Sequence, residues 1–291
     1  MISAVLILLL IGMVSTVYML QAREQLADAR GMQHKIHQCQ IARQTFGSVI
    51  HELLTRHRDD LDGQPAALFS DNENDTGFWN YYEKPFTYHG AQVRLQDMAG
   101  LIGASELTTP VGRQLMRGAG ADDETIRIFI NSLRDWEDED DLRRLDGAER
   151  AWYREQGRPG PRNAPIANVA ELRLIRGYPQ VLDEWIDNGW LVLSSQHYFN
   201  PATAPKKLLA AFLNNAQLAE QLHTLRQGAP LSRAQFVSLT GKQEGSGLLL
   251  TPALDIRVTV TASSQYAQCT QRLVLGIRGN NVDPYTLRAD Y

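Results

Sequence analysis

The chain opens with MISAVLILLLIGMVSTVYMLQA (residues 1–22), a stretch without a charged side chain; Arg23 is the first charged residue. About twenty apolar residues in a helix are enough to cross a bilayer. A cleaved signal peptide is the alternative, but it would have a basic start, a shorter apolar core and a small-x-small cleavage site. The sequence therefore predicts a transmembrane helix over residues 1–22. With no Lys or Arg ahead of the stretch, the positive-inside rule leaves its orientation open.

The residues that follow continue this helix. Apolar residues recur at gaps of three and four, the spacing that forms one stripe along an α-helix. The stripe consists of Ala22, Leu26, Ala29, Met32, Ile36, Cys39, Ala42, Phe46, Val49 and Leu53. It predicts an amphipathic extension of the helix over residues 23–58. A membrane tether alone needs no such stripe, so we expect a sheet to pack on it.

Alternating apolar and polar residues predict the strands of that sheet. Ala91, Val93 and Leu95 belong to a first strand that ends near Asp97, and similar alternation returns over residues 254–260, 273–277 and 285–289. The residues between these groups read almost entirely as helices. We therefore expect an α+β fold in which a long helix packs on an antiparallel sheet. Residues 59–97 and 253–291 would form the β domain, with an all-α domain inserted over residues 98–252.

Composition limits the class of protein. The chain has 291 residues, of which 43% are hydrophobic and 21% charged, with a formal net charge of -4. The length suggests about two globular domains. The mild acidity excludes a general polyanion binder, because phosphate contacts need clustered Lys and Arg. No catalytic Ser-His-Asp or Cys-His arrangement can be argued from spacing. We therefore predict that the protein is not an enzyme.

The two cysteines are too few for a disulfide scaffold or a four-thiolate zinc site. Cys39 lies on the apolar stripe, and Cys269 has the odd parity of Leu273, Leu275 and Ile277. Both should therefore face the contact between helix and sheet. A bridge between them is possible if the domain is periplasmic. The alternative is two unrelated buried thiols that behave as small apolar side chains.

The predicted helical region contains a dense acidic run, Asp135-Trp136-Glu137-Asp138-Glu139-Asp140-Asp141, with Glu149 beyond it. So many like charges repel one another unless they stay hydrated or a hard cation gathers them. Calcium accepts six to eight oxygens in flexible geometry, although the spacing here is not that of an EF-hand. A solvated acidic loop is the alternative that the run alone favours. Trp136 indicates an ordered loop anchored to a core.

Two segments suggest a different function. Leu172, Ile175 and Gly177 follow the pattern of half a helix-hairpin-helix, and a second turn-rich segment spans residues 200–205. Such a hairpin can offer backbone amides to a DNA phosphate. The alternative function is thus a membrane-anchored periplasmic DNA-binding or DNA-uptake protein. A Gly-terminated helix with a packed turn explains the same residues, and the acidic run argues against a phosphate partner. We therefore expect no nucleic acid.

Taken together, these features resemble the minor pseudopilin K family of the type II secretion system. The most specific part is the run of residues 132–141 followed by Gly147-Ala148-Glu149 and Tyr153. The resemblance continues, in order, through Asn163-Ala164-Pro165-Ile166, residues 171–177, residues 200–205 and Ser263-Ser264-Gln265-Tyr266.

The resemblance implies a pilin-like fold and a structural subunit that caps the tip of a short periplasmic pseudopilus. It also implies a part in initiating assembly of the pseudopilus for export of folded proteins across the outer membrane. The implied partners are minor pseudopilins of the I and J types, the H type, and the inner-membrane secretion platform. The implied location is the inner membrane, crossed once, with most of the chain in the periplasm. Members of this family bind calcium in or near the inserted domain, which makes five carboxylates candidate ligands: Asp135, Asp138, Asp140, Asp141 and Glu149.

Overall fold

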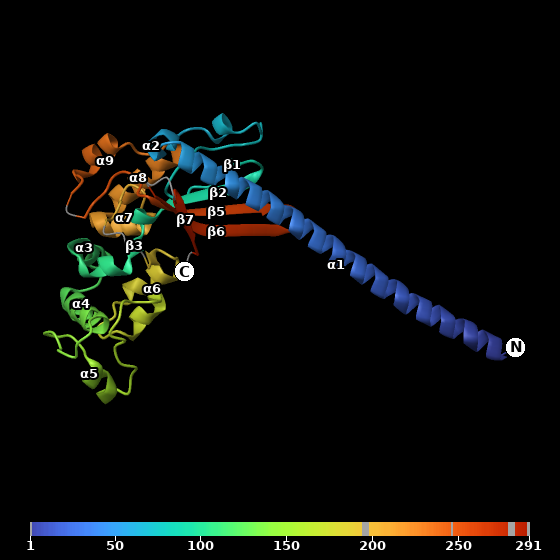
Figure 1. Cartoon of the computed structure of the whole chain (residues 1–291), viewed down its shortest axis with the longest axis horizontal. Coiled ribbons are helices and arrows are strands. Elements are labelled where there is room, and N and C mark those ends of the chain that lie inside the picture. Colours follow the sequence, from blue (N-terminus) through green and yellow to red (C-terminus); the bar gives the residue numbers. More distant parts are fainter. Residues whose placement is uncertain (1, 194–197, 246, 279–282, 290–291) are drawn as a thin grey trace.

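A single long helix forms the N-terminal part of the molecule (Figure 1). The computed structural model describes residues 2–193, 198–245, 247–278 and 283–289, and the side chains of residues 2–8 and 10 lie outside this description. Helix α1 (Ile2–Thr55) is 54 residues long and extends far beyond the rest of the chain (Figure 1). The prediction of one continuous N-terminal helix is confirmed. It ends slightly earlier than expected because His57 is extended and the short helix α2 (Arg58–Leu61) turns Leu61 into the core.

The predicted transmembrane segment lies at the free end of α1. Among the described residues, no helix is both long enough and apolar enough to span a bilayer. Several side chains of residues 1–22 lie outside the description. The membrane span therefore stays a prediction.

A five-stranded antiparallel sheet has the order β1-β2-β5-β6-β7. Its strands are β1 (Phe86–Tyr88), β2 (Ala91–Asp97), β5 (Asp255–Ser263), β6 (Gln268–Ile277) and β7 (Tyr285–Arg288). Strands β2 and β5 pair directly, with Asp97 opposite Ile256, so the chain leaves the sheet and returns to it at one place. The α+β class with an antiparallel sheet is confirmed.

Two details of the strands differ from the sequence prediction. Strand β1 was not predicted, because three residues are too few to display an alternation. The alternation over residues 285–289 predicted that one face of β7 is buried, but Tyr285 and Leu287 on that face are 39% and 43% exposed. Leu254 is also exposed and precedes β5. A strand in the last position of the sheet can keep the alternation without burying it.

The helix covers the sheet with only part of its apolar stripe. Ala42, Phe46, Val49 and Leu53 are buried in one cluster with residues of β2, β5 and β6. By contrast, Leu26, Met32 and Ile36 are 52%, 67% and 49% exposed. The prediction that a sheet covers the whole stripe is therefore wrong for its N-terminal half. The physical reason is that the β5–β6 hairpin is shorter than the helix. Its turn reaches α1 at His34, on which Tyr266 stacks.

Where the hairpin ends, its turn contacts the helix. The ring of Tyr266 stacks on that of His34, with 4.7 Å between ring centroids. A disulfide joins Cys39 of α1 to Cys269 of β6, with 5.1 Å between Cα atoms and a sequence separation of 230 residues. Cys269 therefore faces the helix, on the side that its parity predicted. The bridge links the protruding helix to the sheet at the edge of their contact.

The chain between β2 and β5 is mostly helical (Figure 1). Its α-helices are α3 (Pro110–Gly118), α4 (Asp123–Glu137), α5 (Arg150–Glu155), α6 (Val181–Asp187), α7 (Lys206–Leu213), α8 (Ala216–Gly228) and α9 (Arg233–Thr240). Short 3-10 helices are η2 (Met98–Gly100), η3 (Ala104–Thr108) and η4 (Val169–Leu174). The two-residue strands β3 (Ile102–Gly103) and β4 (Leu191–Val192) pair in parallel and were not predicted. Most of these helices share a core that contains Phe129, Trp136, Tyr153 and Trp185. Whether residues 98–252 form a domain of their own stays a prediction.

Asp97 ties this helical part to the sheet. Its carboxylate is fully buried and accepts four hydrogen bonds. The donors are Thr203 Oγ1 at 2.8 Å, Asn200 Nδ2 at 2.9 Å, Ala99 N at 3.0 Å and Ala253 N at 3.1 Å. Burial raises the pKa of Asp97, while these hydrogen bonds act in the opposite direction. One carboxylate thus joins the end of β2, the approach to α7 and the approach to β5.

The two segments that suggested DNA binding are packed into the fold. Asn200 is buried and donates to Asp97. Gly177 has a positive φ of 75°, and a Cβ at this position would lie 2.9 Å from the backbone nitrogen of Phe129. The turn after η4 therefore lies directly on α4. Both segments are therefore packed turns, which is the alternative to a DNA-binding hairpin that the sequence analysis gave.

A pH-dependent loss of stability is expected from Asp62, just after α2. Burial, followed by the charge of Asp59, raises its pKa to about 7. The folded chain therefore binds more protons than the unfolded chain between about pH 4 and 7, and stability falls as pH rises through that window. We expect Asp62→Asn to be neutral at pH 4 and to add about 2 kcal/mol to the unfolding free energy at pH 8. Urea unfolding at both pH values checks this, with exposed Asp60→Asn as the control. Equal effects at the two pH values would contradict it.

Candidate metal centre

Helix α4 places the acidic run at its C-terminal end. Asp122 caps the helix start by accepting a hydrogen bond from Thr125 N at 2.8 Å. Phe129, Leu133 and Trp136 bury one face, so the last turn of the helix is held against the core. At Asp138 the backbone becomes extended (φ -77°, ψ 165°) and the chain leaves the helix axis. The carboxylates that follow therefore lie in the loop that connects α4 to α5.

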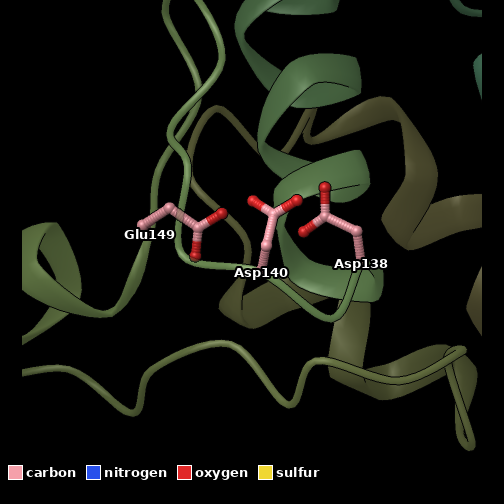
Figure 2. A group of neighbouring side chains, drawn as sticks. All are labelled: Asp138, Asp140 and Glu149. Atoms are coloured by element: carbon pink, nitrogen blue, oxygen red, sulfur yellow. The ribbon is translucent and has the colours of Figure 1, made fainter.

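Three carboxylates from two sides of this loop converge. Asp138, Asp140 and Glu149 each place a carboxylate oxygen within 4.8 Å of the others, as their side chains in Figure 2 illustrate. Calcium binds oxygen at about 2.3–2.6 Å, so two oxygens on the same ion lie at most about 5 Å apart. The three side chains fit this limit. They are three of the five candidate ligands expected from the sequence.

Glu149 gives this cluster its unusual electrostatics. The residue is only 3% exposed, and both carboxylate oxygens lack a hydrogen-bond partner among the described residues. Asp138 Oδ1 is also buried without a partner in the described part of the chain. Burial, followed by the charges of Asp135, Asp138, Asp141 and Asp140, raises the pKa of Glu149 to about 7. Buried carboxylate oxygens without donors are costly, and a bound cation would relieve that cost.

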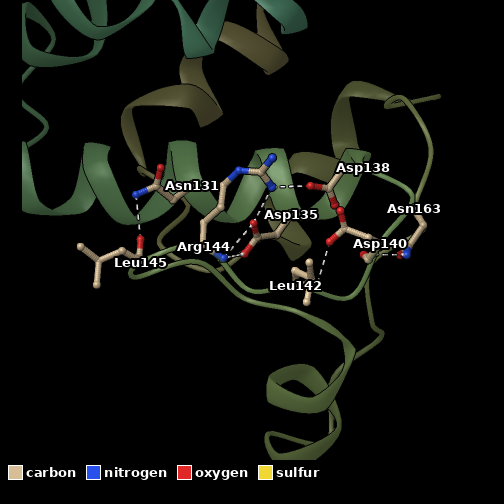
Figure 3. Close-up of polar contacts among 8 residues, drawn as sticks. All are labelled: Asn131, Asp135, Asp138, Asp140, Leu142, Arg144, Leu145 and Asn163. Carbon is tan, nitrogen blue, oxygen red and sulfur yellow. Dashed lines mark hydrogen bonds and ion pairs between the residues drawn. The ribbon is translucent and has the colours of Figure 1, made fainter.

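Arg144 supplies one positive charge at the edge of the cluster. Its guanidinium pairs with Asp135 at 2.8 Å and with Asp138, as Figure 3 shows. Asp135 is fully buried and also accepts hydrogen bonds from the Arg144 backbone nitrogen. Its carboxylate is thus occupied from within the chain. Sequence analysis did not identify Arg144, since a single Arg after an acidic run has no distinctive spacing.

The remaining candidate, Asp141, is exposed and lies outside the group of three. Asn163 is a further neighbour that sequence analysis did not name as a site residue. Its amide donates to the carbonyls of Glu139 and Asp140 at 3.3 Å, and its Oδ1 is buried without a partner among the described residues (Figure 3). The motif that contains Asn163 was visible, but its contact with the loop was not. Which carboxylates act as ligands stays a prediction.

Trp136 anchors the loop, as its place amid acidic residues suggested. The indole is 2% exposed, and its Nε1 donates to Glu171 Oε1 at 2.8 Å. Glu137, next to it, accepts from Ile166 N at 3.3 Å, and burial together with the charge of Glu171 raises the pKa of Glu137. Two neighbouring residues of the acidic run are therefore hydrogen-bonded to the segment 166–171.

These features define a class of protein: an α+β chain with a long N-terminal helix, an antiparallel sheet and a helical insertion that carries a cluster of carboxylates. Residues 93–184 match the protein family described as "Type II secretion system (T2SS), protein K". The matched residues run from β2 through the acidic loop to α6. This match agrees with the resemblance found in the sequence, and over these residues the chain is similar to that family.

Two further comparisons complete this result. A search of curated proteins finds no match to this sequence. Among solved structures, the chain is similar to one chain of the GspK-GspI-GspJ complex from the type II secretion system of enterotoxigenic Escherichia coli. The identity is 14%, the TM-score is 0.47, and the similarity covers 92% of this chain and 97% of the other. A similarity at this level carries no argument about function.

Proposed function

We propose that this protein is a minor pseudopilin of the type II secretion system and a structural subunit rather than an enzyme. The family match over residues 93–184 is the observation that carries the proposal. The pilin-like architecture supports it, because a long helix that protrudes from a sheet is suited to packing among other such helices. In this role the subunit caps the tip of the pseudopilus and helps initiate its assembly for protein export.

The arrangement of the chain is compatible with a place at the tip. In Figure 1 the helical insertion lies at the end of the molecule opposite the N-terminus of α1. A bulky body at that end would block further subunits above it. The match of residues 93–184 to a secretion-system family supports other pseudopilins as partners. We propose I-type and J-type pseudopilins as direct partners, with the H type and the inner-membrane platform as further partners.

The proposed location is the inner membrane, with residues 1–22 as a single span and the remainder in the periplasm. The large apolar side chains that are described at Leu9 and between Ile11 and Leu20 support this anchor, because in the isolated chain they are 47–70% exposed. We expect the chain to stay in the membrane pellet after alkaline carbonate extraction. Release by carbonate would contradict an integral anchor.

Co-expression tests the proposed function. The full chain should co-purify in mild detergent with the I-type and J-type pseudopilins of its own bacterium as one complex of defined stoichiometry. The matched control is the same preparation without one of the two partners. Formation of an I–J pair from which this chain is absent would contradict the assignment.

We also propose that Asp138, Asp140 and Glu149 hold a structural calcium ion. Support comes from their convergence within 4.8 Å and from the unpartnered, buried oxygens of Glu149. Hard carboxylate oxygens in a flexible loop suit calcium better than a softer metal. Arg144 would remain on Asp135, so the ion and the guanidinium would share the negative charge of the loop.

Calorimetry of the full chain in detergent tests the calcium proposal. At a calcium concentration of about 100 times Kd, ligand binding adds roughly 2.7 kcal/mol, which corresponds to a Tm rise of roughly 5–10 °C. Glu149→Gln should raise Tm in chelator, because a poorly solvated charge is removed, and should abolish the response to calcium. Glu139→Gln, an exposed acid of the same loop, is the matched control and should respond like the unaltered chain. Equal Tm values with calcium and with chelator would leave the loop as a solvated acidic surface.

A further inference from the structure

A small groove between α3 and α4 has a charge opposite to that of the chain. Its cavity has a volume of about 200 Å³ and is lined by Arg113, Arg117, Asp123, Ile126, Arg127, Ile130 and Asn131. Three guanidinium groups and one carboxylate thus meet in a protein whose net charge is -4. A local reversal of charge in a concave site concentrates ligands of the opposite sign.

The arginines differ in how far they are already neutralised. Arg117 pairs with Asp123 at 2.5 Å, and Arg127 pairs with Asp146 of the acidic loop. Arg113 is exposed and has no ion pair or side-chain hydrogen bond within the described part of the chain. It lies one helical turn from Arg117 on the same face of α3. One guanidinium fork is therefore free to bind an oxyanion, with a second close beside it.

The remaining walls favour a carboxylate side chain over a larger anion. Ile126 and Ile130 also line the groove, although they are only 3% and 1% exposed, so its lining is not wholly charged. The volume is smaller than the roughly 300–1,000 Å³ of a small-molecule pocket, so one side chain is the ligand that fits. Beside the groove, Asn131 Nδ2 donates to Leu145 O at 2.9 Å, and the Leu145 side chain is 82% exposed. An exposed apolar side chain therefore belongs to a residue that is hydrogen-bonded to the lining of the groove.

We propose that this α3–α4 groove is a docking site for a partner protein, which inserts a Glu or Asp side chain beside an apolar residue. Arg113 forms a forked ion pair with the carboxylate, and Leu145 contacts the neighbouring apolar side chain. Arginine suits this role because its planar fork matches carboxylate geometry, and it is enriched among residues that dominate interface energy. The site lies outside the acidic cluster and adds a second interaction surface to the proposed secretion role.

Fluorescence anisotropy with labelled, end-blocked peptides tests this site on the full chain in detergent. The probes are Gly-Ser-Glu-Leu-Gly-Ser and its Gln counterpart, which differ only in the carboxylate. We expect the Glu peptide to bind at least about fivefold more tightly at low salt, and Arg113→Gln to remove that preference. Arg94→Gln, an exposed arginine of β2, is the matched control and should keep it.

Two results would overturn the proposal. One is equal affinity of the two peptides, or an unchanged preference in Arg113→Gln. The other is displacement of the Glu peptide by inorganic phosphate at concentrations where acetate has no effect, which would identify a phosphate site instead. Neither result bears on assembly with other pseudopilins, which the co-purification measures separately.

Discussion

Removal of the Cys39–Cys269 bridge is expected to lower the free energy of unfolding by about 2–5 kcal/mol. The bridge spans a sequence separation of 230 residues, so it restricts a large part of the unfolded chain. It also joins α1 to β6 where the helix begins to leave the sheet. The double variant Cys39→Ser/Cys269→Ser, measured by urea unfolding of the full chain, checks the magnitude.

Reductant provides the matched control for the bridge. Dithiothreitol should destabilise the unaltered chain by about the same amount and should not affect the double variant, which has no bridge to lose. Hydrogen exchange of α1 should increase most around residues 36–46, near the bridge. An unaltered chain whose unfolding is the same with and without reductant would contradict a stabilising bridge.

Asp97→Ala is expected to cost about 4 kcal/mol, because it removes a fully buried carboxylate that accepts hydrogen bonds from four donors. Two of the donors belong to Asn200 and Thr203, more than 100 residues away, so the loss affects the junction between sheet and helical insertion. Asp97→Asn should be intermediate, since it keeps the shape but presents an amide group to donors. Urea unfolding measures both variants.

Asp122→Ala is the matched control for Asp97. Asp122 also accepts a backbone N–H, at 2.8 Å from Thr125, but it is exposed at the start of α4. Its loss should cost about 1 kcal/mol, the usual value for an N-cap. If Asp97→Ala were no more damaging than Asp122→Ala, the junction would not depend on the buried carboxylate.

The candidate site was partly predictable because its residues cluster in sequence. Asp138 and Asp140 lie in one acidic run, and Glu149 follows a short loop. The pairing of Arg144 with Asp135 was not predictable, since it depends on how the loop folds back along α4. The same holds for Asn163, which reaches the carbonyls of residues 139 and 140 from a separate segment.

The hydrogen bonds of Asp97 could not be predicted from the sequence either. The sequence places it at the end of a strand, and the structure confirms that position. Nothing in its neighbours shows that a buried Asn and Thr from far along the chain would bind it. A polar residue at the end of a strand is ordinary, and its importance arises only from burial.

The sequence by itself determined the long N-terminal helix, the main strands of the sheet, the helical region between them and the facing parity of the two cysteines. These follow from the periods of apolar residues, which local backbone geometry imposes. Tertiary structure alone decided how much of the helix the sheet covers, which carboxylates lack a partner, and that Arg113 faces a groove. These depend on contacts between distant segments, where packing and desolvation select the outcome and a local pattern carries no record of it.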